Sequence, residues 1–98
     1  MPGTKDQNLQ PMGYQQITAL SASTALTVPA GAKYALIQAE VQEVRYRDDG
    51  TAPTGTVGMW LAPSTADAYI ALWYTGKLSA LRFIESAASA KLNVSYYA

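Results

Sequence analysis

One cluster of acidic residues, Asp48-Asp49-Gly50, has the residue types of a cation site. Two carboxylates beside a glycine can supply oxygen ligands to calcium. The D-x-[DN]-x-[DN]-G spacing of a calcium-binding loop is absent, however, and Asp and Gly are the residues that a hairpin turn needs at positive φ. We therefore predict a turn at this cluster, with no metal and no cofactor.

A second pair of acids, Glu40 and Glu43, could serve glycoside hydrolysis, which needs two carboxyl groups several Å apart across a cleft. These acids alternate with Arg45 and Arg47, so surface ion pairs explain them better. The chain has no Cys and no His, which removes a thiol nucleophile and the commonest general base. Glycine-rich phosphate loops and nucleophile elbows are also missing. We expect no catalytic residue and no enzymatic activity, with a small hydrolase as an alternative.

The aromatic residues form an unusual set of seven Tyr, two Trp and one Phe. Side chains with an apolar body and a polar tip suit surfaces that stack on sugars or bind partners. Each of them singly could also fill the core or a sheet edge. As a group they predict an exposed patch, and such patches mark interaction sites. The candidate interface residues in this group are Trp60, Tyr69, Trp73 and Tyr97.

Length and composition indicate one folded domain. The 98 residues are 49% hydrophobic and 14% charged, which argues against disorder of the whole chain. A formal net charge of zero supplies no basic field for nucleic acid or anionic lipid. The longest apolar run, Ala68 to Tyr74, is far shorter than the roughly 18 residues of a membrane span. We therefore expect neither nucleic-acid binding nor membrane insertion.

Turn residues recur along the chain and leave gaps of strand length. Residues 1–13 are predicted to form an extended or flexible N-terminal arm, whose apolar anchors Leu9 and Met12 could lie across a neighbouring subunit. Residues 14–98 form the predicted domain, an all-β fold with a single antiparallel β-sandwich or jelly roll of about seven strands. The candidate strands are Tyr14–Leu20, Ala25–Val28, Tyr34–Arg47, Thr54–Ala62, Tyr69–Tyr74, Leu78–Glu85 and Leu92–Tyr97.

Two segments allow an alternative. Ser64 to Trp73 could hold a short helix capped by Ser64 and Asp67. Ser86 to Ala90 could form one helical turn, although a plain connection is simpler.

The central hairpin allows a prediction of register. In Tyr34–Arg47 the apolar residues occupy odd positions from Ile37 to Val41 and even positions from Val44, so a regular strand would place them on opposite faces. A bulge at Gln42-Glu43 would restore them to one face. If Arg47 lies opposite Thr54, the pairs that share the buried face are Val44 with Val57, Val41 with Met59 and Ala39 with Leu61.

Two other strands have clear patterns. In Leu92–Tyr97 we predict that Leu92, Val94 and Tyr96 point inward. Leu78–Glu85 is apolar on both faces except for Arg82, so we expect it to be central and expect Arg82 to pair with Glu40, Glu43 or Glu85.

Four segments together resemble a known group of proteins. They are LTVPAGAKYALIQAE at 26–40, VRYRDDGT at 44–51, GKLSALRFI at 76–84 and LNVSYY at 92–97. As a set they are similar to short proteins of tailed bacteriophages and prophages, which are regarded as minor virion components or head-decoration proteins. The resemblance covers residues 14–97 and carries over no catalytic residue. It implies a β-sandwich or jelly-roll subunit that attaches to a capsid or tail and self-associates.

The favoured functional hypothesis is therefore a non-enzymatic structural virion protein, made in the host cytoplasm and located in the virion. Its expected partners are further copies of itself and capsid or tail subunits. The alternative is a carbohydrate-binding module for attachment to a host surface, with Trp60, Trp73 or Tyr97 as its stacking platform.

Overall fold

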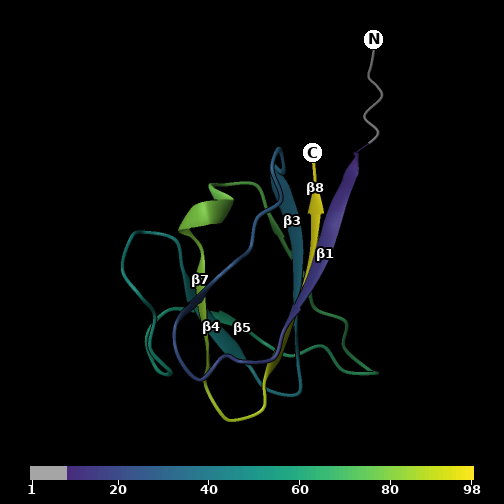
Figure 1. Cartoon of the computed structure of the whole chain (residues 1–98). Coiled ribbons are helices and arrows are strands. Elements are labelled where there is room, and N and C mark those ends of the chain that lie inside the picture. Colours follow the sequence, from purple (N-terminus) through teal and green to yellow (C-terminus); the bar gives the residue numbers. More distant parts are fainter. Residues whose placement is uncertain (1–8) are drawn as a thin grey trace.

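The computed structural model describes residues 9–98, and they form strands and one short 3-10 helix (Figure 1). Both apolar anchors of the predicted arm, Leu9 and Met12, lie within the described residues. The strands are β1 (Pro11–Ile17), β2 (Thr24–Ala25), β3 (Tyr34–Glu40), β4 (Val44–Arg47), β5 (Met59–Leu61), β6 (Leu72–Tyr74), β7 (Arg82–Glu85) and β8 (Lys91–Tyr97), and the 3-10 helix η1 is Leu78–Ala80.

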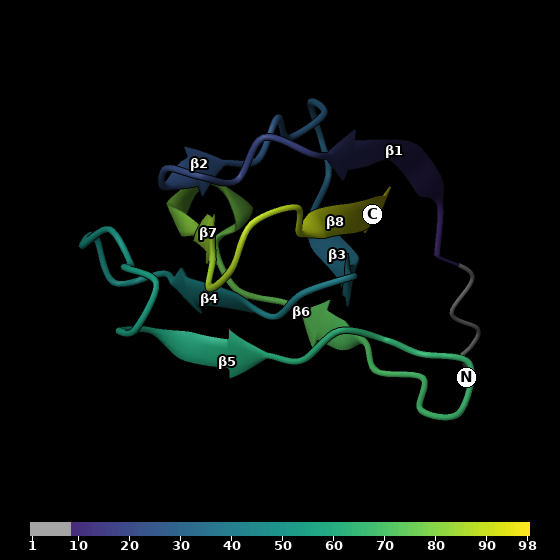
Figure 2. The same cartoon turned by 90° about the horizontal axis from the view of Figure 1, so that it is seen from below.

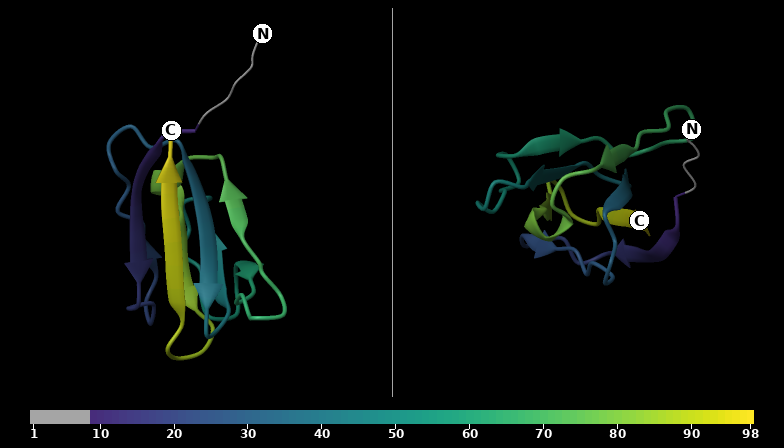
Figure 3. Two further views of the ribbon diagram at one scale, coloured as in Figure 1. Left: turned by 90° about the vertical axis from the view of Figure 1, so that its right-hand side faces the viewer. Right: turned by 90° about the horizontal axis from the view of Figure 1, so that it is seen from above.

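The strands form two antiparallel sheets of four strands each, which confirms the predicted all-β class. Sheet A has the order β1-β8-β3-β6 and sheet B the order β2-β7-β4-β5. Figure 2 shows the two sheets as separate layers, and the left view of Figure 3 looks onto sheet A. Residues 9–98 contain no helix that is long and apolar enough to cross a membrane.

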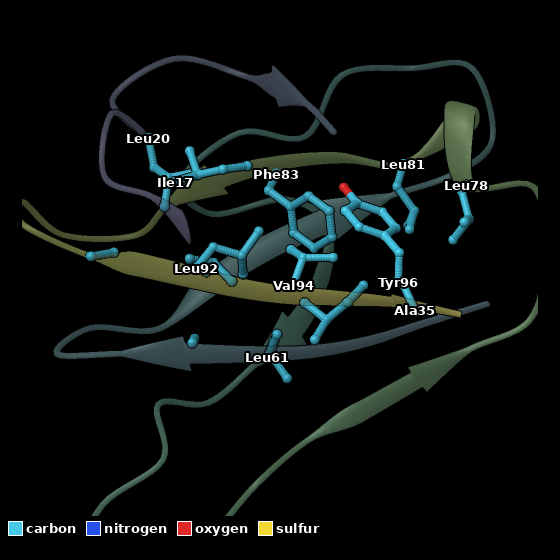
Figure 4. Packing of buried hydrophobic residues seen from close by; sticks show 14 residues of the cluster. Ile17, Leu20, Ala35, Leu61, Leu78, Leu81, Phe83, Leu92, Val94 and Tyr96 are labelled. Atoms are coloured by element: carbon cyan, nitrogen blue, oxygen red, sulfur yellow. The ribbon is translucent and has the colours of Figure 1, made fainter. Parts of the chain in front are cut away.

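The hydrophobic core lies between the two layers (Figure 4). Leu92, Val94 and Tyr96 of β8 are at most 1% exposed, as the alternation predicts. Phe83 of β7 and Leu81 just before it meet them from the other layer, and both are fully buried. Because alternate residues of β8 and β3 fill this core, the residues between them must form the outer face of sheet A.

The prediction of a central hairpin is wrong in two respects, the continuity of its first strand and its register. Tyr34–Arg47 divides into β3 and β4, which belong to different sheets, so the chain crosses between layers where a bulge was expected. Val41 lies in this crossing at a φ of 73°, which is rare for a β-branched residue. Val44 lies opposite Leu61 rather than Val57.

The altered register divides the six residues expected on one buried face. Ala39, Val44 and Leu61 are buried, whereas Val41, Val57 and Met59 are 57%, 51% and 62% exposed. The reason is local in each case. Val41 is in the crossing, Val57 is in the long β4–β5 loop that holds the Asp48-Asp49-Gly50 turn, and Met59 is on the edge strand β5.

The other strand boundaries shift moderately. β1 begins at Pro11, because Gln10 and Ala98 exchange two backbone hydrogen bonds that extend its pairing with β8. Three residues of the predicted arm are thus part of sheet A, and β2, β5 and β6 are shorter than expected. Residues 64–71 form a loop and not a helix. In this loop the Ser64 hydroxyl donates to the Ile70 carbonyl at 2.6 Å and accepts a hydrogen bond from the Ile70 N–H at 3.0 Å.

The segment Leu78–Glu85 gives one confirmed prediction and one correction. β7 lies inside sheet B, as expected for a strand that is apolar on both faces. Arg82, however, is exposed, and its guanidinium donates to the carbonyls of Ser79 and Leu81 instead of pairing with a glutamate. The correction follows from its parity, since Arg82 alternates with the buried Phe83 and so points to the outside of the sheet.

Candidate functional site

The outer face of sheet A is a surface without net charge that extends over four strands. Its strands are in register, so that Trp73, Leu36, Ser95 and Tyr14 form one row across all four strands. Glu40 and Lys91 lie opposite each other at one end of β3 and β8. They are the only charged residues in the four strands of sheet A. We call this surface the uncharged face; it comprises Tyr14, Gln16, Tyr34, Leu36, Gln38, Trp73, Asn93, Ser95 and Tyr97.

Three aromatic rings gather at one end of the uncharged face. Trp73 stacks on Tyr34, with ring centroids 5.8 Å apart and an interplanar angle of 21°. The Tyr97 ring, on the strand beyond β3, lies 5.6 Å from the Trp73 ring at an interplanar angle of 49°. Because Trp73 packs against two neighbouring tyrosines and is still 42% exposed, it presents an ordered apolar surface to solvent.

The middle of the uncharged face is a network of neutral polar groups. The Asn93 Oδ1 accepts hydrogen bonds from the Tyr14 hydroxyl at 2.6 Å and from the Gln16 Nε2 at 2.9 Å. A shallow hollow of about 130 Å³ lies beside this network and is also lined by Gln38 and Tyr69. These amide and hydroxyl groups can donate and accept hydrogen bonds without a change of protonation.

The outer face of sheet B has a different chemistry. Arg45, Arg47, Arg82, Ile84 and Trp60 point outward from β4, β7 and β5, and we call this set the arginine face. The Arg45 guanidinium carbon lies 5.1 Å from the Trp60 ring centroid, which is within cation–π range. The Arg47 Nε donates to the Asp49 Oδ1 at 3.0 Å, and this hydrogen bond lowers the pKa of the Asp49 carboxyl.

A second hollow, of about 320 Å³, lies at the end of the β4–β5 hairpin. Its lining combines Arg47, Asp48 and Asp49 with the apolar side chains of Val57 and Met59. Asp48 accepts a hydrogen bond from the Tyr74 hydroxyl at 2.7 Å. Burial, together with this hydrogen bond, raises the pKa of Tyr74 to about 12. Asp48 and Asp49 thus bind side chains of the protein itself, and residues 9–98 hold no group of three or more His, Cys, Asp or Glu that could bind a metal.

The predicted interface residues divide among three places. Trp73 and Tyr97 lie together on the uncharged face, with Tyr69, 76% exposed, at its edge. Trp60 is 64% exposed on the opposite sheet. Leu9 is exposed before β1, whereas Met12 is half-buried and packs against the core.

The sequence-based prediction missed Tyr14 and Tyr34 on the uncharged face. Their signal was present in the alternation of β1 and β3, where they share parity with polar outward residues.

Comparison of the chain with protein-family models, with curated proteins and with solved structures gave no match.

Proposed function

We propose that this protein is a non-enzymatic structural subunit of a tailed-bacteriophage virion, which self-associates and holds neighbouring capsid or tail subunits. The observation that carries the proposal is the uncharged face of sheet A. The cores of protein interfaces are depleted in charged residues and enriched in Tyr and Trp, which is the composition of this surface. Trp73, packed against Tyr34 and Tyr97, supplies the aromatic anchor that such an interface needs.

The strand order also supports a structural role. β1 pairs with β8, β2 with β7, β3 with β6 and β4 with β5, as in one long hairpin folded over into two sheets. This connectivity favours a jelly roll, the finer fold that we propose for the chain. Jelly rolls occur in viral capsid proteins and in lectins, so the support is by analogy of fold. The segments that resemble tailed-phage virion proteins favour the capsid or tail among these settings.

A single added charge tests self-association. Gln38→Glu keeps the shape of a side chain on the uncharged face but would bury a charge in the interface, so we expect the dissociation constant of the homo-oligomer to rise at least about tenfold. Sedimentation velocity and native mass spectrometry over a range of concentrations measure this constant. Gln42→Glu, in the β3–β4 crossing, is the control with the same chemical change and should leave it unaltered. A native protein that stays monomeric at millimolar concentration would refute self-association.

The hollow beside Asn93 supports a second candidate function, the binding of a neutral carbohydrate. Amide and hydroxyl groups line it, and Tyr69 supplies an aromatic surface at its edge. Trp73 supplies a second aromatic surface, because it lies directly opposite Leu36, which also lines the hollow. In Trp60→Phe, which leaves Trp73 as the only indole, a neutral oligosaccharide should shift the tryptophan emission, and Asn93→Ala should remove this response. An emission unchanged by any neutral oligosaccharide would eliminate this candidate.

A further inference from the structure

The arginine face carries positive charge that the described residues do not neutralise. Arg47 and Arg82 lie directly opposite each other on β4 and β7, an arrangement in which like charges repel. Asp49 forms an ion pair with Arg47, and this is the one ion pair of the arginine face within residues 9–98. The Arg82 guanidinium has only two long hydrogen bonds, at 3.3 and 3.4 Å, to backbone carbonyls. Because two nitrogens of the Arg47 guanidinium already bind Asp49, an added anion would pair with Arg82.

Arg45 adds a third guanidinium to the same surface. It lies one row along from Arg47, opposite Ile84 and Trp60. Its Nη1 donates to the Gly58 carbonyl at 3.2 Å, whereas its Nε is buried without a hydrogen-bond partner among the described residues. Three of the seven basic residues of the chain thus gather on one side of four short strands.

Trp60 places an exposed aromatic ring beside these charges. Its side chain is 64% exposed, so much of the indole is open to solvent. The C–H bonds of a sugar ring can pack against the negative face of an indole. An oxyanion site and a ring-stacking site therefore occupy one continuous surface.

The distance between the two sites sets the size of the ligand. β4 separates β7, which carries Arg82, from β5, which carries Trp60. Two strand spacings amount to about 10 Å, so one sugar ring on Trp60 leaves Arg82 free. The ligand needs at least two linked rings, with an anionic group on the ring nearer to Arg82.

The same geometry argues against nucleic acid. Sites for single strands combine a positive groove that follows the backbone with aromatic rings for successive bases. The arginine face offers one exposed aromatic residue and a compact block of three arginines, with Asp49 beside one of them. This arrangement suits a short ligand with few charges better than a polyphosphate chain.

We propose that the arginine face binds an acidic oligosaccharide, in which a sugar carboxylate lies at Arg82 and a neighbouring sugar ring stacks on Trp60. The site is on sheet B, on the opposite layer from the uncharged face, so it can be correct or wrong independently of self-association. A protein with both surfaces would join its own copies through one sheet and contact an acidic glycan through the other.

Titration with a galacturonic acid tetramer tests this proposal. In Trp73→Phe, which leaves Trp60 as the only indole, the tetramer should change the tryptophan emission with a dissociation constant in the millimolar range or below. Adding Arg82→Gln should raise this constant at least tenfold, since a charge-assisted hydrogen bond to the carboxylate is lost. Lys33→Gln removes the same charge away from sheet B and should change the constant less than twofold.

Four results would each overturn the proposal. They are the absence of saturable binding up to 10 mM tetramer, equal affinity for a neutral glucose tetramer, equal weakening by Lys33→Gln and Arg82→Gln, and tighter binding of a single-stranded oligonucleotide of equal charge. Weaker binding of the oligonucleotide and of inorganic phosphate than of the tetramer supports it. The oligomer mass of Arg82→Gln, measured in parallel, separates failure of this site from failure of self-association.

Discussion

Phe83→Ala is expected to lower the free energy of unfolding by about 3–5 kcal/mol, the range for loss of a fully buried phenylalanine. Phe83 is completely buried between the layers and lies 5.8 Å from the Tyr46 ring, measured between centroids. Few other large side chains can fill the space, because Leu92 and Val94 opposite it are held on β8 by pairing on both sides. Since whole domains have only about 5–15 kcal/mol of stability, this one change could leave the variant partly unfolded at 25 °C.

Urea unfolding followed by circular dichroism measures this loss. Trp60→Ala is the matched control, because it also removes a large aromatic side chain but from an exposed position. We expect the control to cost less than about 1 kcal/mol. A loss below about 1 kcal/mol for Phe83→Ala, or equal losses for the two variants, would contradict the packing of the two sheets through Phe83.

The fold was predictable where local alternation alone determines which side is buried. β8 alternates without interruption between two neighbouring strands, so the inward positions of Leu92, Val94 and Tyr96 followed from its pattern. In Tyr34–Arg47, a bulge within one sheet and a crossing between two sheets both restore the parity of the apolar residues. Only contacts with distant strands decide between them, and they place Val41 in the crossing.

The candidate surfaces were predictable by residue type but not by location. Exposed Trp60 and Trp73 were expected, yet they belong to opposite sheets because β5 and β6 are consecutive strands in different layers. Arg82 was expected to pair with a glutamate in a central strand, since its neighbours Leu81 and Phe83 are both apolar. The 3-10 helix ends just before it, and the short strand that follows turns its side chain outward beside Arg47.

Tyr96 is expected to make the protein lose stability at alkaline pH. Its ring is 1% exposed, and its hydroxyl donates to the Gln15 Oε1 at 2.7 Å. Burial raises the pKa of Tyr96 from 10.0 to about 12 in the folded protein. Below pH 10 the phenol is neutral in both the folded and the unfolded protein, so its contribution to the free energy of unfolding is fully present. Between pH 10 and pH 12 the unfolded chain ionises first, so the stabilisation by Tyr96 falls with rising pH, by about 3 kcal/mol in total.

Tyr96→Phe separates this effect from other alkaline titrations. At pH 7 the variant should be less stable than the native protein by about 1 kcal/mol, because the hydrogen bond to Gln15 is lost. Phenylalanine does not ionise, so the variant lacks the decline due to Tyr96, and the two stability curves should cross between pH 10 and pH 12. Denaturant unfolding of both proteins at intervals from pH 7 to pH 12 measures the difference, in which the titration of the lysines and of the other tyrosines largely cancels. If that difference stays constant over the whole range, the Tyr96 phenol ionises equally in both states, and the buried hydrogen-bonded position described for it is wrong.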